Sequence, residues 1–88
     1  MKKLIVKGIV QGVGFRYYTY EIARKYDIYG YSKNLRDGTV EVVISNDDNE
    51  NYQIFLNELW IGPHSARVEC IEEVEIEDEK FYDFFIRH

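Results

Sequence analysis

The sequence predicts an α+β domain in which two helices cover one face of a mainly antiparallel sheet. Apolar residues alternate at a period of two in five segments and recur at helical spacing in two others. The order along the chain is strand, helix, strand, strand, helix, strand, with a short last strand. Turn residues separate the segments, most clearly at Asp37-Gly38 and Gly62-Pro63.

The first strand is predicted at residues 2–10. Leu4 and Val6 share one of its faces, whereas Ile5 and Ile9 share the other. Apolar residues on both faces are typical of a strand with a neighbour on each side. We therefore expect a central strand.

The first helix is predicted at residues 14–26, with Asp27 and Gly30 flanking its end. Its apolar stripe is expected to face the core and consists of Phe15, Tyr18, Ile22 and Tyr26. Strands are predicted next at residues 29–35 and 39–45. The Asp-Gly pair between them favours a tight hairpin turn.

The second helix is predicted at about residues 48–60. Asp47, Asp48 and Glu50 are interpreted as residues that cap its start, where acidic side chains suit the helix dipole. Its apolar stripe consists of Tyr52, Phe55, Leu56 and Leu59. The Gly-Pro pair after it favours the end of the helix at that point.

The fourth strand is predicted at about residues 66–77. Four apolar residues share one phase there and are Val68, Cys70, Val74 and Ile76. Cys70 is accordingly interpreted as a small core residue rather than a nucleophile. Ile71 is out of phase, which indicates a β-bulge near it. A short last strand is predicted at residues 81–87.

This order of elements is that of the ferredoxin-like α/β sandwich. The first helix is a crossover, so the first two strands run parallel and the third returns antiparallel between them. The carboxyl ends of the first two strands then lie at the same edge of the sheet. We expect the turn at residues 11–16, Asn34 and Thr39 to converge at that edge.

Composition narrows the function classes. The chain has 88 residues, which is enough for one domain, 1–88, and no second one. The net charge is −5 and the basic residues form no stripe, which argues against nucleic acid as a partner. With one cysteine, no internal disulfide can form, which favours a reducing compartment. No stretch has the length of a signal-peptide core or membrane span, so we expect a soluble, cytoplasmic monomer that contacts no membrane.

The segment around which the chain is organised is Val10-Gln11-Gly12-Val13-Gly14-Phe15-Arg16. Two glycines let the backbone curl so that successive N–H groups point inward. The start of the helix adds unpaired N–H groups and the positive end of its dipole. The guanidinium of Arg16 can then bind two oxygens of one phosphate. This pattern predicts a cradle for a phosphate-sized dianion, and a tight turn with a solvated arginine is the alternative.

Two segments resemble the signatures of the acylphosphatase family. The first runs from Val6 to Arg16 and the second from Gly30 to Val40, within a likeness that covers nearly the whole chain. Two residues depart from the family's pattern: Ser32 replaces a small apolar residue, and Asn46 replaces a glycine after the third strand. The resemblance implies a ferredoxin-like fold with strand order 4-1-3-2 and hydrolysis of acyl phosphates to carboxylate and inorganic phosphate.

The resemblance also implies site residues. Arg16 would bind the phosphate, the backbone N–H groups of Gln11, Gly12, Val13, Gly14 and Phe15 would complete the cradle, and Asn34 would orient the attacking water. Thr39 is predicted to support the region of Asn34 with its hydroxyl, or simply to be a β-branched strand residue. A carboxylate leaves without a general acid, so we expect no metal and no cofactor, with inorganic phosphate as product and inhibitor.

The sequence gives less support to other kinds of functional site. His64 and His88 are interpreted as solvated, and the acidic residues between 69 and 79 as an exposed face rather than a calcium site. The rival to an enzyme is a ferredoxin-like binding or regulatory domain without turnover, for phosphate, a small ligand or RNA. In the RNA case Tyr29, Tyr31 and Tyr82 would stack on bases. A metallochaperone of this fold would need a Cys-x-x-Cys motif, which the sequence lacks.

Overall fold

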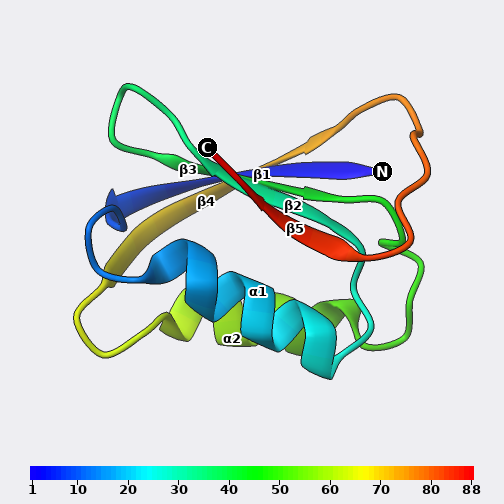
Figure 1. Cartoon of the computed structure of the whole chain (residues 1–88), viewed down its shortest axis with the longest axis horizontal. Helices are drawn as coiled ribbons and strands as arrows, with labels where there is room; N and C mark the ends of the chain where they lie inside the picture. Colours follow the sequence, from blue (N-terminus) through cyan, green and yellow to red (C-terminus); the bar gives the residue numbers. More distant parts are fainter.

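A five-stranded sheet carries both helices on one of its faces in the computed structural model, which describes residues 1–88 (Figure 1). The elements in chain order are β1 (Lys2–Ile9), α1 (Phe15–Lys25), β2 (Gly30–Asn34), β3 (Val40–Ile44), α2 (Tyr52–Ile61), β4 (Arg67–Glu75) and β5 (Phe84–Arg87). The predicted order of elements and the ferredoxin-like α+β class are confirmed.

The strands lie in the order β4-β1-β3-β2-β5. β1 pairs antiparallel with β3 on one side and with β4 on the other, which makes it central, as its two apolar faces predict. β3 lies between the parallel strands β1 and β2, and β5 pairs with β2 in parallel. The carboxyl ends of β1, β2 and β5 consequently lie at one edge of the sheet.

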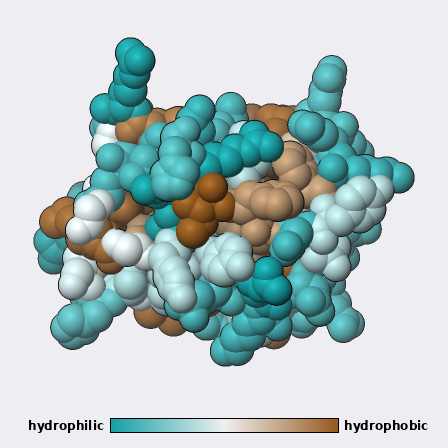
Figure 2. All heavy atoms as spheres, in the orientation of Figure 1, coloured by the Kyte–Doolittle hydropathy of each residue, from teal (hydrophilic) through white to brown (hydrophobic).

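The core lies between the sheet and the helices. Its largest side chains are Phe15, Phe55 and Phe84, each at most 1% exposed. Both predicted helix stripes face it: Ile22 and Leu59 are buried, and the stripe tyrosines are partly buried against the core. The surface that carries α1 and β5 is mainly hydrophilic, with apolar atoms near its centre (Figure 2).

The predicted phase of β4 is wrong. The register with β1 changes from Lys7 opposite Cys70 to Gly8 opposite Val68, so Glu69 is the extra residue of a bulge. A bulge was expected near Ile71, and it lies two residues earlier. It turns Val68 and Ile71 to the core and leaves Cys70 exposed.

Gly8 explains where the bulge can form. Its φ is +132°, and a Cβ atom built there would lie 2.0 Å from the carbonyl oxygen of Arg67. Only a residue without a side chain allows that approach of β4 to β1.

The predicted caps of α2 are also wrong. Asn51 occupies the N-cap position and makes no side-chain capping bond. Asp47 instead lies 3.3 Å from the amino group of Met1. The side chain of Asn46 accepts from the backbone N–H of Tyr29 and donates to the carbonyl oxygen of Asp27. These polar groups close the end of the sheet opposite the glycine loop, residues 11–14, and are not free to cap a helix.

Candidate active site

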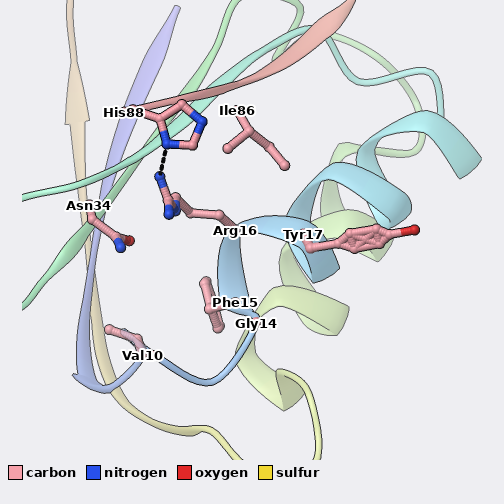
Figure 3. Close-up of a pocket in the computed structure, with 9 residues that line it drawn as sticks. Val10, Gly14, Phe15, Arg16, Tyr17, Asn34, Ile86 and His88 are labelled. Carbon is pink, nitrogen blue, oxygen red and sulfur yellow. Dashed lines mark hydrogen bonds between the residues drawn. The ribbon is translucent and has the colours of Figure 1, made fainter.

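Three segments meet at the edge of the sheet where β1, β2 and β5 end (Figure 3). They enclose a pocket of about 360 Å³. Its lining residues are Val10, Gly12, Gly14, Phe15, Arg16, Tyr17, Asn34, Ile86 and His88. The structure therefore brings Asn34 and the end of β5 to the glycine loop and Arg16, which adjoin each other in the sequence.

The glycine loop has the backbone conformation that an anion cradle requires. Gly12 and Gly14 have φ values of +74° and +77°. A Cβ atom at either position would meet nothing within 4 Å, so backbone conformation rather than space explains why glycine stands there. The backbone N–H groups of residues 11–14 donate no hydrogen bond within the chain. They are available to an anion, together with the first turn of α1.

Arg16 extends from the first turn of α1 into the pocket. Its Nη1 donates to the carbonyl oxygen of Arg87 at 2.9 Å and lies 3.3 Å from Nδ1 of His88. A guanidinium has five N–H groups, so these contacts leave others for a ligand. Figure 3 shows the carboxamide of Asn34 pointing toward this guanidinium.

Asn34 carries an unusual polar atom. Its Oδ1 is buried and has no hydrogen-bond partner in the chain. Leaving a buried acceptor without a partner costs about 1–3 kcal/mol of folding free energy. Such atoms are therefore rare in native proteins, and each one calls for an explanation such as a functional role. Asn34 lines the pocket, so its carboxamide is the neutral amide group beside the place where a small polar molecule such as water would bind.

The side chain of Gln11 points away from the pocket. Its Nε2 donates to the carbonyl oxygens of Leu35 and Thr39, at 2.7 and 2.8 Å. Gln11 can therefore contribute only its backbone N–H to the cradle. The same limit applies to Phe15, which is 1% exposed, and to Val13, which packs against the core.

Thr39 lies in the β2–β3 turn and does not line the pocket. Its hydroxyl donates to Asp37 at 2.6 Å and its backbone N–H donates to the same oxygen at 3.0 Å. Both hydrogen bonds lower the pKa of Asp37, and the bond from the hydroxyl has the larger effect. Thr39 therefore supports the turn that follows Asn34 rather than touching a ligand.

His88 and Ile86 line the pocket although the sequence did not single them out as site residues. His88 is exposed, as expected, but it contacts Arg16 rather than only solvent. The pairing of β5 with β2 places both residues there, because the end of a strand parallel to β2 reaches the same edge of the sheet. Alternation within β5 does not say which neighbour the strand takes.

The remaining ionisable groups form no alternative site. No three His, Cys, Asp or Glu side chains are grouped so that they could hold a metal ion. The acidic residues of β4 are exposed, and Glu72 and Glu75 pair with Lys7 and Lys2. Neither helix has the length and apolar composition that crossing a membrane requires.

Known proteins share this architecture and sequence. The family described as acylphosphatase matches residues 2–86. The chain belongs to the acylphosphatase family.

Individual relatives agree with that assignment. Acylphosphatases of Thermotoga petrophila and Pasteurella multocida are each 41% identical to this chain; the alignments cover 98% and 99% of it, and 94% and 97% of the relatives. The crystal structure of acylphosphatase from Bacillus subtilis superposes with a TM-score of 0.90 at 34% identity, covering 99% of this chain and 97% of that one. The resemblance seen in the two sequence signatures is thereby confirmed.

Proposed function

We propose that this protein is an acylphosphatase, a hydrolase that splits the carboxyl–phosphate bond of acyl phosphates into a carboxylate and inorganic phosphate. The observation that carries the proposal is one pocket that joins unpaired backbone N–H groups, a guanidinium and a buried amide oxygen without a partner. Family membership and the neighbouring structures support the same activity.

The glycine loop and Arg16 would hold the phosphoryl group. The N–H groups of residues 11–15 and the guanidinium would neutralise its oxygens, and charge on these oxygens is what the protein must stabilise in phosphoryl transfer. Because these donors are fixed before the substrate arrives, they need not reorganise during the reaction.

Asn34 would hold the attacking water opposite the acyl oxygen. Water oxygen forms a bond to phosphorus while the bond from phosphorus to the acyl oxygen breaks, and the carboxylate departs with the electron pair. The proton of the water passes to a phosphoryl oxygen and leaves with inorganic phosphate. A carboxylate needs no proton to depart, so the reaction asks for no general acid, metal or cofactor.

Thr39 and the side chain of Gln11 would hold these groups in place without contacting the substrate. Thr39 holds the turn through Asp37, and Gln11 ties that turn to the glycine loop. We assign neither side chain a contact with substrate.

An RNA-binding domain without turnover is not favoured. It would need free aromatic rings on the sheet. Tyr29 and Tyr82 lie outside the strands, and the ring of Tyr31 in β2 is covered by Phe81, with centroids 5.9 Å apart, and by the guanidinium of Arg87, 4.0 Å away. The net charge of −5 also opposes a polyanion. We further propose a single domain that works as a cytoplasmic monomer.

Hydrolysis of benzoyl phosphate tests the activity. We expect the purified protein to release benzoate and inorganic phosphate, added phosphate to inhibit competitively, and a chelator to leave the rate unchanged. A protein that binds phosphate but does not turn over would support the regulatory alternative, and loss of activity with chelator would contradict the metal-free reaction.

A further inference from the structure

The end of β5 brackets the guanidinium of Arg16. Two atoms from consecutive residues lie within hydrogen-bond distance of the same Nη1 atom: the carbonyl oxygen of Arg87, which accepts at 2.9 Å, and Nδ1 of His88 at 3.3 Å. Figure 3 shows the imidazole on one side of this guanidinium and the carboxamide of Asn34 on the other. One edge of the guanidinium is thus held by protein, while Asn34 lies across from it.

Sheet topology places this bracket. β5 runs parallel to β2 with Arg87 opposite Lys33, so the next residue of each strand, His88 and Asn34, reaches the same edge. α1 packs against β5, which brings Arg16 from the first turn of the helix to the end of that strand. The contact therefore joins elements at both ends of the sequence.

We propose that His88 is a positioning residue for Arg16, a role that rests on the proposed function. In the tautomer that carries its proton on Nε2, the imidazole accepts a hydrogen bond at Nδ1. An arginine side chain has many rotamers, and ordering them on binding costs affinity. His88 reduces that cost by holding one edge of the guanidinium, which leaves other N–H groups directed at the phosphoryl oxygens.

Two other accounts of His88 give different results. The imidazole could contact the phosphate directly, in which case its effect would not depend on Arg16. The carbonyl oxygen of Arg87 could hold the guanidinium without help, in which case replacing His88 would change nothing. A double-mutant cycle between Arg16 and His88 separates all three.

The test is a titration with inorganic phosphate at about pH 8, followed through the amide NMR signals of Gly12 and Gly14. We expect His88→Ala to raise the Kd for phosphate about 3- to 10-fold, the range that one hydrogen bond can supply. His88→Asn, whose Oδ1 can accept in place of Nδ1, should recover most of this loss. His64→Ala is the matched control and should bind like the wild type, because His64 is exposed in the α2–β4 loop and is absent from the pocket lining.

The decisive comparison is made in an Arg16→Ala background. We expect His88→Ala to cause no further loss there, because the residue acts through the guanidinium. An equal loss in both backgrounds, or no loss in the wild type, would overturn the positioning role. If the wild-type protein bound no phosphate at all, the proposed function itself would fail, which the same spectra would show.

Discussion

The Nε2 atom of Gln11 lies 2.8 Å from the carbonyl oxygen of Thr39, across the gap between the glycine loop and the β2–β3 turn. A second bond from the same atom reaches Leu35, the residue after Asn34, at 2.7 Å. One amide thus fixes the distance between the segment that would bind phosphate and the segment that would position water.

Replacing Gln11 should therefore impair turnover more than a surface change would. Gln11→Ala removes two hydrogen bonds between the glycine loop and the turn, although backbone N–H groups of Gly38 and Leu35 still donate to the two carbonyl oxygens. We expect a loss of about 1–3 kcal/mol in the free energy of unfolding and about 10-fold in kcat. Urea denaturation and benzoyl phosphate kinetics measure the two effects. Gln53→Ala, on the exposed face of α2, is the matched control. A destabilised variant with unchanged kcat would show that the bonds serve stability alone.

Arg16→Lys should not rescue the loss seen in Arg16→Ala. An ammonium keeps the charge but cannot bind two phosphate oxygens through a planar fork, nor keep the contacts with β5 at the same time. We expect kcat/KM to fall at least about 10-fold in Arg16→Lys and further in Arg16→Ala. Steady-state kinetics with benzoyl phosphate give the comparison, and wild-type activity in the lysine variant would remove the requirement for a guanidinium.

Ser32→Ala should stabilise the protein. The hydroxyl of Ser32 is fully buried and has no hydrogen-bond partner, so its removal relieves a desolvation cost of about 1 kcal/mol. The urea midpoint should rise while kcat stays the same, because Ser32 does not line the pocket. Ser65→Ala, at an exposed position, should change neither quantity. A lower midpoint in Ser32→Ala would indicate that the hydroxyl has a partner such as a buried water.

The pKa of Asp37 predicts a pH dependence of the turn. Hydrogen bonds from Thr39 lower this pKa, so the ionised carboxylate favours the folded state. Its contribution is present above the pKa of aspartate in the unfolded chain, about 4, and is lost as the pH falls through the lower folded value. The difference in Tm between the wild type and Asp37→Ala should be full at pH 6 and shrink below about pH 4.

The control for that experiment is Asp48→Ala, because Asp48 is exposed and makes no hydrogen bond in the structure. Its Tm difference from the wild type should not follow the same curve. A difference for Asp37→Ala that stayed constant down to pH 2 would show that the carboxylate is not held by Thr39.

Much of this fold followed from patterns that are local in the sequence. The spacing of Phe15 and Ile22 located a helix face, and the crossover that α1 makes put the ends of β1 and β2 at one edge. The shared edge predicts that Arg16 lies near Asn34, as the pocket shows. What local patterns could not supply depends on partners distant in the chain.

The features that the sequence predicted wrongly all depend on such distant partners. Alternation signalled a change of phase in β4 but not that Gly8, some 60 residues earlier, would accept the bulge at Glu69. Asp47 suits a helix cap by local rules, yet the amino group of Met1 lies beside it. The position of His88 followed from the pairing of β5 with β2, which periodicity leaves open.

The cradle would bind phosphate while Asn34 acts on water, and the most direct measurement of this division compares kcat with phosphate affinity in Asn34→Ala. We predict a fall of about 10²–10³-fold in kcat for benzoyl phosphate, by analogy with the removal of one stabilising donor elsewhere. The Kd for inorganic phosphate should stay within about threefold of the wild type, since the loop and Arg16 remain. Full turnover in Asn34→Ala, or a loss of phosphate binding as large as the loss of kcat, would contradict this division of roles.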